Sequence, residues 1–224
     1  MSAYVNDILE QPDALVRTLQ GLESFKGNSL ADQFPLRRYR RLILTGMGSS
    51  LAVLYPLWIS LVRSGLNPLL IETGELLLGV SDLLVEGTLV IVVSQSGESI
   101  EVVRLLERSQ SATIVAVTNE SGSALANQSD LVFLMHAGPE YSGASKTYVS
   151  SLAVLHMLPA FLLDPAGIEL MFRDLYSVAE KMRQFLSKFS DLARESAKLL
   201  NERSIIICGR GSSLAACEGG ALIL

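Results

Sequence analysis

An alternation of short apolar runs with longer helix-like stretches constrains the fold of this chain more than any other feature. Strands that alternate with helices predict a parallel sheet whose two faces are both covered. We therefore expect an α/β fold with a parallel, five-stranded, doubly wound sheet of the flavodoxin-like type. The predicted strands are 42–45, 69–72, 88–93, 112–118 and 131–135, and the helical stretches between and after them are 50–64, 100–109, 124–128 and 146–163.

Helical segments are predicted on both sides of this sheet-forming unit. Residues 6–20 have the apolar spacing of an amphipathic helix, in which Pro12 marks a break or a fresh start. Asp164-Pro165-Ala166-Gly167 is a stop signal, and 169–201 then predicts a long amphipathic helix or a helix pair between two units. The expected division is an N-terminal helical segment at 1–37, a first domain at 38–165 and linking helices at 166–202.

One internal repeat extends this division. Residues 41–52 and 204–215 both read as an apolar strand, a Gly-x-Gly-Ser-Ser turn and a helix start. Similarity at so long a period indicates duplicated domains. We therefore expect 203–224 to be the start of a second domain that is cut short here, with a missing part of about 130 residues or more.

Charge and composition exclude several classes of function. The net charge is −5, and the basic cluster of residues 37–41 is better explained as a solvated strand entry than as a nucleic-acid surface. No apolar run reaches the roughly 18 to 20 residues of a membrane span, and the acidic N-terminus has no signal-peptide pattern. The expected protein is cytoplasmic, with no nucleic-acid or membrane partner.

The metal-binding residue types are also sparse. Cys208 and Cys217 are the only two cysteines, too few for a disulfide framework or a metal signature. His136 and His156 stand alone on apolar segments, where a packed or surface histidine is the better interpretation. We expect no metal and no cofactor.

Two polar loops follow predicted strands, where open α/β sheets bind ligands. Gly46-Met47-Gly48-Ser49-Ser50 offers backbone N–H groups and a helix start, which favours an anion, although ordinary helix capping explains it equally well. It lacks the third glycine of a dinucleotide site and the lysine of a P-loop. Ser94-Gln95-Ser96-Gly97-Glu98-Ser99 has three hydroxyls, an amide and no basic residue, which suits a phosphate held by neutral donors and a helix dipole.

A third loop links the fifth strand to the long helix at 146–163. Ser145 is expected to cap this helix, and small residues such as Gly143 allow a ligand to approach closely. Glu140 is expected either to orient sugar hydroxyls or to brace the loop, and the sequence does not decide between these roles.

Together the loops resemble those of the sugar isomerase (SIS) domain family. Residues 94–99 resemble its phosphate loop, which normally reads Ser-Gln-Ser-Gly-Glu-Thr, with Ser99 keeping the hydroxyl of the usual threonine. Residues 137–140 and 144–145 resemble its Ala-Gly-Pro-Glu and Ala-Ser-Thr-Lys elements, and 10–12 its Glu-Gln-Pro. The resemblance is strongest to the isomerase half of glucosamine-6-phosphate synthase and to fructosamine-phosphate deglycases.

The resemblance implies a phosphorylated sugar as ligand, tandem SIS domains and a homodimer. The phosphosugar-binding residues it implies are Ser49, Ser50, Ser94, Gln95, Ser96, Ser99, Gly143 and Ser145, with Glu140 as the sugar-orienting candidate.

The sequence also departs from the synthase pattern. That family continues its Gly-Arg-Gly strand into Leu-Glu-Gly-Ala-Leu-Lys-Leu-Lys-Glu; counted from Gly209, the first glutamate falls on Gly219 and the first lysine on Ile223. The last glutamate, the family's isomerisation base, would fall beyond Leu224, so no catalytic residue is assigned. Lys146-Thr147 reverses the family's Thr-Lys order.

Two function classes remain open. The first is an isomerase, or a deglycase or deaminase, that acts on a ketose or amino-sugar 6-phosphate with a carboxylate base. The altered 219 and 223 positions favour the deglycase or deaminase chemistry, and the expected absence of a preceding amidotransferase domain argues against a complete glutamine-dependent synthase. The alternative is a non-catalytic regulatory protein that binds a sugar phosphate.

Overall fold

A parallel sheet forms the centre of the protein. The structure is a computed structural model that describes residues 2–28, 30–109, 111–141, 143–199 and 205–223. The strand order is β2-β1-β3-β4-β5 and all neighbouring strands are parallel, which is the flavodoxin-like order. The predicted fold class is confirmed, and each strand agrees with its prediction to within one residue at either end: β1 (Arg41–Gly46), β2 (Leu69–Glu72), β3 (Thr88–Val93), β4 (Thr113–Thr118) and β5 (Leu131–Leu134).

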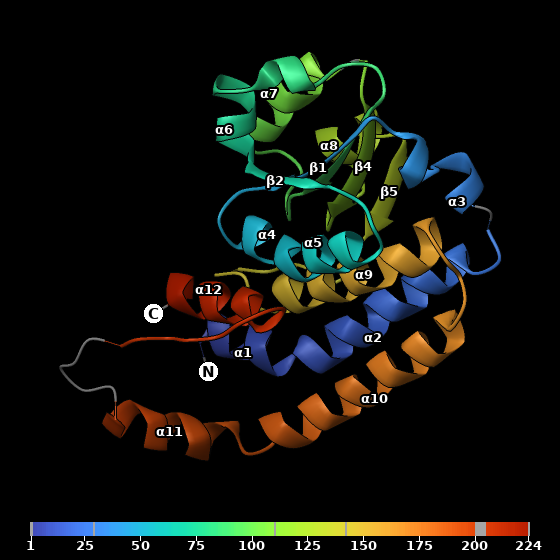
Figure 1. Cartoon of the computed structure of the whole chain (residues 1–224). Helices are drawn as coiled ribbons and strands as arrows, with labels where there is room; N and C mark the ends of the chain where they lie inside the picture. The colour runs from blue at the N-terminus through green and yellow to red at the C-terminus, as the bar shows by residue number, and fades with distance from the viewer. Residues whose placement is uncertain (1, 29, 110, 142, 200–204, 224) are drawn as a thin grey trace.

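Helices cover both faces of this sheet (Figure 1). Alternate side chains of β1 and β3 point to opposite faces, so Leu44 and Ile91 belong to one core and Ile43 and Val92 to the other. The first core is completed by α2 (Gln11–Leu22), α5 (Leu54–Arg63) and α9 (Lys146–Leu162), and the second by α6 (Thr73–Leu78), α7 (Ile100–Arg108) and α8 (Ala124–Gln128). β3 is buried at all six positions.

Prolines divide two of the predicted helices. The N-terminal stretch forms α1 (Ala3–Leu9) and α2, with Pro12 in the first turn of α2, so Pro12 marks a fresh start. The stretch 50–64 forms α4 (Ser49–Ala52) and α5. Pro56 lies in the first turn of α5 and has no N–H to donate to the carbonyl four residues earlier, so one continuous helix cannot form.

Two short helices lie outside the predicted helical stretches. α6 begins directly after β2, where the Glu72 carboxylate accepts a 3.0 Å hydrogen bond from the Glu75 N–H and caps the helix. α3 (Leu30–Gln33) lies between α2 and β1. Both are too short to show a helical period, and their only sequence signal is a capping residue or a single buried leucine.

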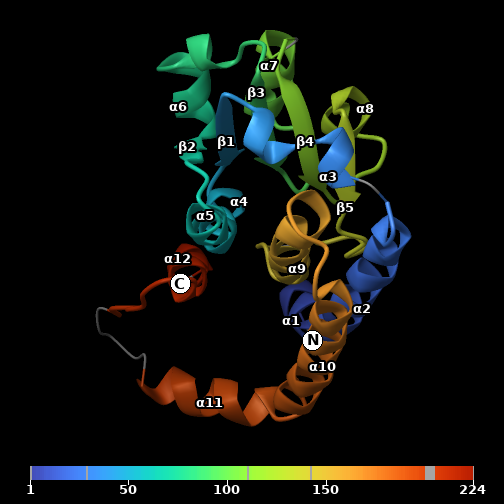
Figure 2. The same cartoon turned by 45° about the vertical axis from the view of Figure 1, so that its right-hand side comes forward.

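The predicted linking segment is a helix pair, α10 (Ile168–Leu186) and α11 (Phe189–Leu199). The last residue predicted for it, Asn201, lies outside the described residues. α10 packs on α2 and α9, and the chain then returns so that α12 (Ser213–Ile223) packs on α4 and α5 (Figure 2).

The second copy of the repeat forms its turn and its helix but not its strand. Ile205, Ile206 and Ile207 are exposed and pair with no strand in the described parts of the chain, and a strand needs a neighbour to bond its backbone; Ser204 lies outside the described residues. The two turns agree in detail. Gly48 and Gly211 both have left-handed φ angles, +51° and +59°, that favour glycine.

Candidate functional site

Two of the predicted loops meet at the topological switch point of the sheet. β1 lies between β2 and β3, and Gly46 at the end of β1 is in register with Val93 at the end of β3. The chain leaves β1 toward the face of α5 and leaves β3 toward the face of α7, which opens a crevice between their carboxyl ends. The turns 46–50 and 94–99 therefore start side by side.

The three serine hydroxyls in the turn from β3 to α7 all act as hydrogen-bond acceptors for backbone N–H groups. The Oγ atoms of Ser94, Ser96 and Ser99 accept hydrogen bonds from backbone N–H groups, at 3.1 Å from Gly97, 3.3 Å from Glu98 and 3.4 Å from Val102. Each hydroxyl that accepts in this way keeps its own hydrogen free to donate. None of the three donates to another group in the described parts of the chain. The turn thus presents hydroxyl donors at the N-terminus of α7, where the helix dipole favours an anion.

Gly97 keeps this turn tight. Its φ angle is +63°, and a Cβ atom there would lie 2.7 Å from the Cβ of Ser123. The neighbouring Glu98 carboxylate accepts a 2.5 Å hydrogen bond from the Ala124 N–H, and the Leu125 N–H donates to the Gly97 carbonyl. The phosphate-loop candidate is therefore fastened to the start of α8 on its far side.

The turn from β1 to α4 faces the same crevice. Ser49 and Ser50 line a small cleft of about 20 Å³ together with Gln95 of the second loop and Thr147 of α9. A Cβ atom on Gly46 would lie 2.7 Å from the Ser50 carbonyl carbon, so the turn can close only with glycine at that position. The hydroxyls of Ser49 and Ser50 bond to no other group within the described residues.

The third loop is organised around Glu140. Its Oε1 accepts from the N–H groups of Ser145, Lys146 and Thr147, at 2.8, 2.9 and 3.3 Å, and from the Ser145 hydroxyl at 3.1 Å. Its Oε2 accepts from the Thr147 hydroxyl. A carboxylate of this chain thus occupies the N-terminus of α9. Of its two expected roles, this geometry favours bracing the loop.

A buried ion pair anchors the same loop to the N-terminal helices. The Lys146 ammonium, whose side chain is 2% exposed, lies 3.0 Å from Asp7 Oδ1 and 2.7 Å from Glu10 Oε2. Burial lowers the pKa of Lys146, but hydrogen bonds and charges from Glu10 and Asp7 outweigh it and leave the pKa raised. Arg17 donates to Glu10 Oε1 at 2.8 Å and to the Ala137 carbonyl at 2.7 Å.

The reversed Lys146-Thr147 order therefore has a structural consequence. Lys146 points into the ion pair on the side of α1 and α2, while Thr147 lines the cleft beside Ser49 and Ser50.

A larger cavity of about 640 Å³ lies next to the cleft. It shares Ser49, Ala144 and Tyr148 with the cleft, and it is lined on its other sides mainly by apolar residues of α1, α10 and α12. The structure divides the eight predicted binding residues among these places. Ser94, Ser96 and Ser99 form the β3–α7 turn, Ser50 and Gln95 line the cleft, Ser49 lines both spaces, and Gly143 and Ser145 line the cavity.

Sequence reasoning missed Thr147 and Tyr148 as lining residues and Asp7 as the partner of Lys146. The first two follow Ser145 within one helical turn, so the register of α9 could have indicated them. Asp7 is separated from Lys146 by most of the domain and gives no such signal.

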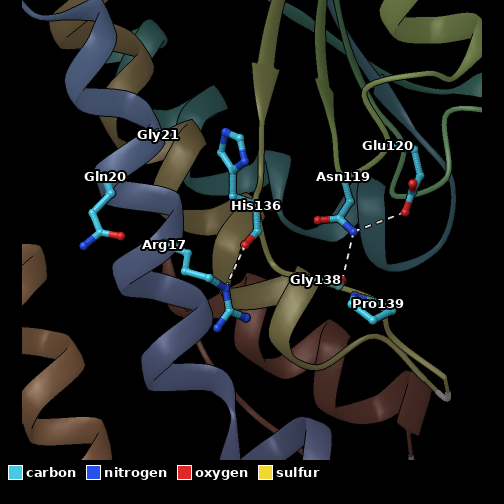
Figure 3. A pocket seen from close by; sticks show the side chains of 8 residues that line it. All are labelled: Arg17, Gln20, Gly21, Asn119, Glu120, His136, Gly138 and Pro139. Atoms are coloured by element: carbon cyan, nitrogen blue, oxygen red, sulfur yellow. Dashed lines mark hydrogen bonds between the residues drawn. The ribbon is translucent and has the colours of Figure 1, made fainter.

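A separate crevice of about 650 Å³ lies at the ends of β4 and β5 (Figure 3). Arg17 reaches from α2 to the His136 carbonyl, and the Asn119 side chain donates to the Gly138 carbonyl at 3.0 Å. His136 has a left-handed φ of +50° and its ring lies against Gly21 of α2. The crevice walls are thus bonded to one another, and the described residues include no group of three or more metal-ligating side chains.

The fold and these loops define an α/β domain of the SIS type, and a family model confirms this class. The model described as SIS domain matches residues 36–160, and the chain belongs to that family. No helix in the described parts of the chain is long and apolar enough to cross a membrane.

Curated relatives are aminotransferases by name. The chain is 32% identical over 226 residues to glutamine–fructose-6-phosphate aminotransferase [isomerizing] of Pyrobaculum aerophilum, covering 98% of this chain and 37% of the relative. It is 31% identical over 240 residues to the human glutamine–fructose-6-phosphate aminotransferase [isomerizing] 2, covering 99% of this chain and 35% of the relative. The chain thus spans a little over a third of the length of these relatives.

Solved structures share the fold. A phosphosugar isomerase described as putative from Silicibacter pomeroyi matches with a TM-score of 0.65 and 28% identity, over 82% of this chain and 56% of that one. The C-terminal domain of glucosamine-fructose-6-phosphate aminotransferase from Francisella tularensis matches with a TM-score of 0.79 and 22% identity, over 99% of this chain and 66% of that one.

Proposed function

We propose that this chain binds a phosphorylated sugar at the β1/β3 switch point. The observation that carries the proposal is the bonding state of Ser94, Ser96 and Ser99, each of which accepts from the backbone and keeps a hydroxyl hydrogen for a ligand. Three neutral donors at a helix N-terminus suit a phosphate, which needs several short hydrogen bonds from one side. The SIS family membership supports the same ligand class.

In this proposal different groups of the predicted residues bind different parts of the ligand. The β3–α7 turn holds the phosphate, Ser49, Ser50 and Gln95 bind next to it, and Gly143 and Ser145 lie along the sugar. Because the Ser145 hydroxyl already donates to Glu140, it is expected to accept from a sugar hydroxyl. Glu140 acts on the sugar through Ser145, by holding it in place.

Titration calorimetry with fructose 6-phosphate, glucosamine 6-phosphate and unphosphorylated fructose tests this site. We expect the two phosphates to bind, fructose to fail, and Ser96→Ala,Ser99→Ala to weaken binding at least about tenfold, the effect of roughly 1.4 kcal/mol of lost hydrogen bonding. Ser99→Thr, which keeps the hydroxyl, should bind like the wild type, as should Ser187→Ala at an exposed serine of the α10 C-terminus. Equal affinity for fructose and fructose 6-phosphate would contradict the proposed phosphate site.

We further propose an enzyme, an isomerase or a deglycase or deaminase acting on a ketose or amino-sugar 6-phosphate, as the activity of the whole protein. The support is that similar proteins are named as isomerizing aminotransferases and as a phosphosugar isomerase. Proton transfer between C1 and C2 exchanges hydrogen with solvent. Fructose 6-phosphate incubated with the full-length protein in D₂O should therefore gain deuterium at C1, and proton NMR measures this gain.

The second candidate is a regulatory protein that binds the sugar phosphate and leaves it unchanged. One observation favours it: Gly219 and Ile223 of α12 line the cavity at the positions where the synthase pattern has a glutamate and a lysine. Binding without deuterium exchange by the full-length protein would support this candidate over the enzyme.

The tandem-domain organisation, the homodimer and the cytoplasmic location belong to the same proposal. Light scattering on the full-length protein during size exclusion tests the dimer, which should give twice the mass of the chain. A monomer at micromolar concentration would contradict it.

A further inference from the structure

Tyr148 stands between the two parts of the proposed site. It lies in the first turn of α9, three residues after Ser145, and its side chain lines both the 20 Å³ cleft and the 640 Å³ cavity. On the cleft side its neighbours are Ser49, Ser50 and Gln95, and on the cavity side they are the apolar residues of α12. Tyr148 therefore lies at the boundary of the two spaces, together with Ser49 and Ala144.

The ring is seated on a glycine of α12. A Cβ atom on Gly219 would lie 2.8 Å from both Cζ and Oη of Tyr148, closer than real Cβ contacts allow. The phenol Oη also donates a 2.5 Å hydrogen bond to the Ala215 carbonyl, one turn earlier on α12. A side chain at position 219 would therefore require the ring to shift from this place.

The phenol stays protonated in this position. Burial, with a further contribution from the charge of Glu218, raises the pKa of Tyr148 to about 12. The hydrogen bond to Ala215 is thus present throughout the physiological pH range, and the ring is held in one place rather than released by a proton. Its role is steric, because a neutral phenol with its hydrogen already donated is not a base.

The cavity beyond the ring differs in character from the cleft. Apart from Gln11, the phenols of Tyr4 and Tyr148 and the serines of the loops, its side chains are apolar, among them Ile8, Val149, Phe185, Leu222 and Ile223. A hydrocarbon lining gives little binding energy to sugar hydroxyls and more to an apolar substituent. Whether a ligand group extends past the Tyr148 ring into the cavity therefore depends first on the size of that group and then on its polarity.

We propose that Tyr148 is a specificity-determining residue of the phosphosugar site. Its ring, held by Gly219 and Ala215, limits how far a ligand anchored at the serine turn can extend into the α12 cavity. The proposal rests on the proposed function, because the phosphate anchor defines the end of the ligand from which this distance is counted.

The experiment compares two ligands on the full-length protein by calorimetry. They are fructose 6-phosphate and a 1-deoxy-1-(benzylamino) derivative of it, which carries an apolar group at the end farthest from the phosphate. We expect the wild type to bind the first more tightly, and Tyr148→Ala to raise the relative affinity for the larger ligand by about tenfold or more, the scale on which a pocket of the wrong size discriminates. Tyr148→Phe keeps the ring and should keep the wild-type ratio.

Tyr148→Leu, which replaces the ring by a shorter apolar side chain, provides a second variant should Tyr148→Ala fail to fold. It should also raise the relative affinity for the larger ligand. A purely structural role for Tyr148 predicts equal losses for both ligands and an unchanged ratio in Tyr148→Ala, and that result would overturn the inference. Failure of fructose 6-phosphate to bind the wild type would instead remove the proposed function, so the two failures are distinguishable.

Discussion

At the scale of single residues, Lys146 shows how a buried charged side chain can hold in place a loop of the proposed site. It follows Ser145 directly, yet its ammonium is buried against Asp7 and Glu10. Burying a charge lowers the stability of the folded protein unless an opposite charge lies beside it. Removing one member of the ion pair is therefore expected to be more destabilising than removing both. The result is a rigid connection between the N-terminal helices and the loop that holds Ser145.

Lys146→Ala should therefore destabilise the protein by about 3 kcal/mol, because it leaves the Asp7 carboxylate buried without its cation. Urea unfolding followed by circular dichroism measures this loss. The double variant Asp7→Asn,Lys146→Met removes both charges and should recover more than half of it. A single variant as stable as the wild type would show that the ion pair contributes nothing.

The same residues show what a sequence can and cannot predict at this scale. The serine arrangement of the turn 94–99 was predictable because the hydrogen bonds to its three serine hydroxyls join residues at most three positions apart. The partner of Lys146 was not predictable, because Asp7 lies on α1 and meets the start of α9 only in the folded chain. Glu140 lies between these cases: its bonds are local, but either expected role was compatible with the residues alone.

At the scale of elements, the N-terminus of α9 is closed by Glu140. The carboxylate satisfies three N–H groups that have no partner within the helix. The start of α7, where the serine turn lies, has no such carboxylate among the described residues and is the proposed site for an external anion. This gives the two helix starts at the carboxyl edge of the sheet different tasks.

Glu140→Ala should cost about 1 to 2 kcal/mol of stability, the usual effect of losing a helix N-cap. It should also weaken sugar-phosphate binding, because Ser145 loses the acceptor of its hydroxyl hydrogen. Glu169→Ala, at an exposed carboxylate of α10 that pairs only with Lys26 in the described parts of the chain, is the matched control and should change neither quantity. Unaltered unfolding of Glu140→Ala in urea would refute the capping role.

The junction of α1 and α2 predicts a dependence on pH. Burial raises the pKa of Glu10, but hydrogen bonds and charges from Lys146 and Arg17 outweigh it, so the pKa lies below the ordinary 4.5. A lowered carboxyl pKa gives stability that is fully present above pH 4.5 and is lost as the pH falls through the lowered value.

The urea midpoint should accordingly fall as the pH drops below about 4.5, and Glu10→Gln should reduce the steepness of that fall. Glu169→Gln, with an exposed carboxylate, should keep the wild-type steepness. If the urea midpoint falls equally steeply with decreasing pH in Glu10→Gln and in the wild type, then protonation of Glu10 is not the cause of the fall.

At the scale of the whole molecule, stability is expected to decrease outward from β3. All six residues of β3 are buried and lie between the two cores, whereas α11 shows mainly exposed side chains where they are described. Regions with few buried contacts open at low free-energy cost.

Native-state hydrogen exchange should therefore find the slowest amides in β3 and its neighbours β1 and β4, and the fastest helical amides in α11. The measured order of protection decides this directly. Protection of α11 equal to that of β3 would contradict it and would imply that another surface covers α11.

The architecture at this scale was largely predictable, since each strand is an apolar run bounded by turn residues. The placement of α12 against α4 and α5 was not, because it depends on contacts between segments more than 150 residues apart. The strand expected at 205–207 depended on pairing, which the described residues do not supply.

The contact between Tyr148 and Gly219 also bears on how this protein could have acquired its differences from its relatives. A side chain at position 219 would force the ring at position 148 to shift. A lineage that gained the ring while position 219 still had a side chain would meet that clash, whereas a lineage that already had the glycine would not. Proteins with this fold are therefore expected to include some with the glycine and no ring, but none that combines the ring with a side chain at position 219.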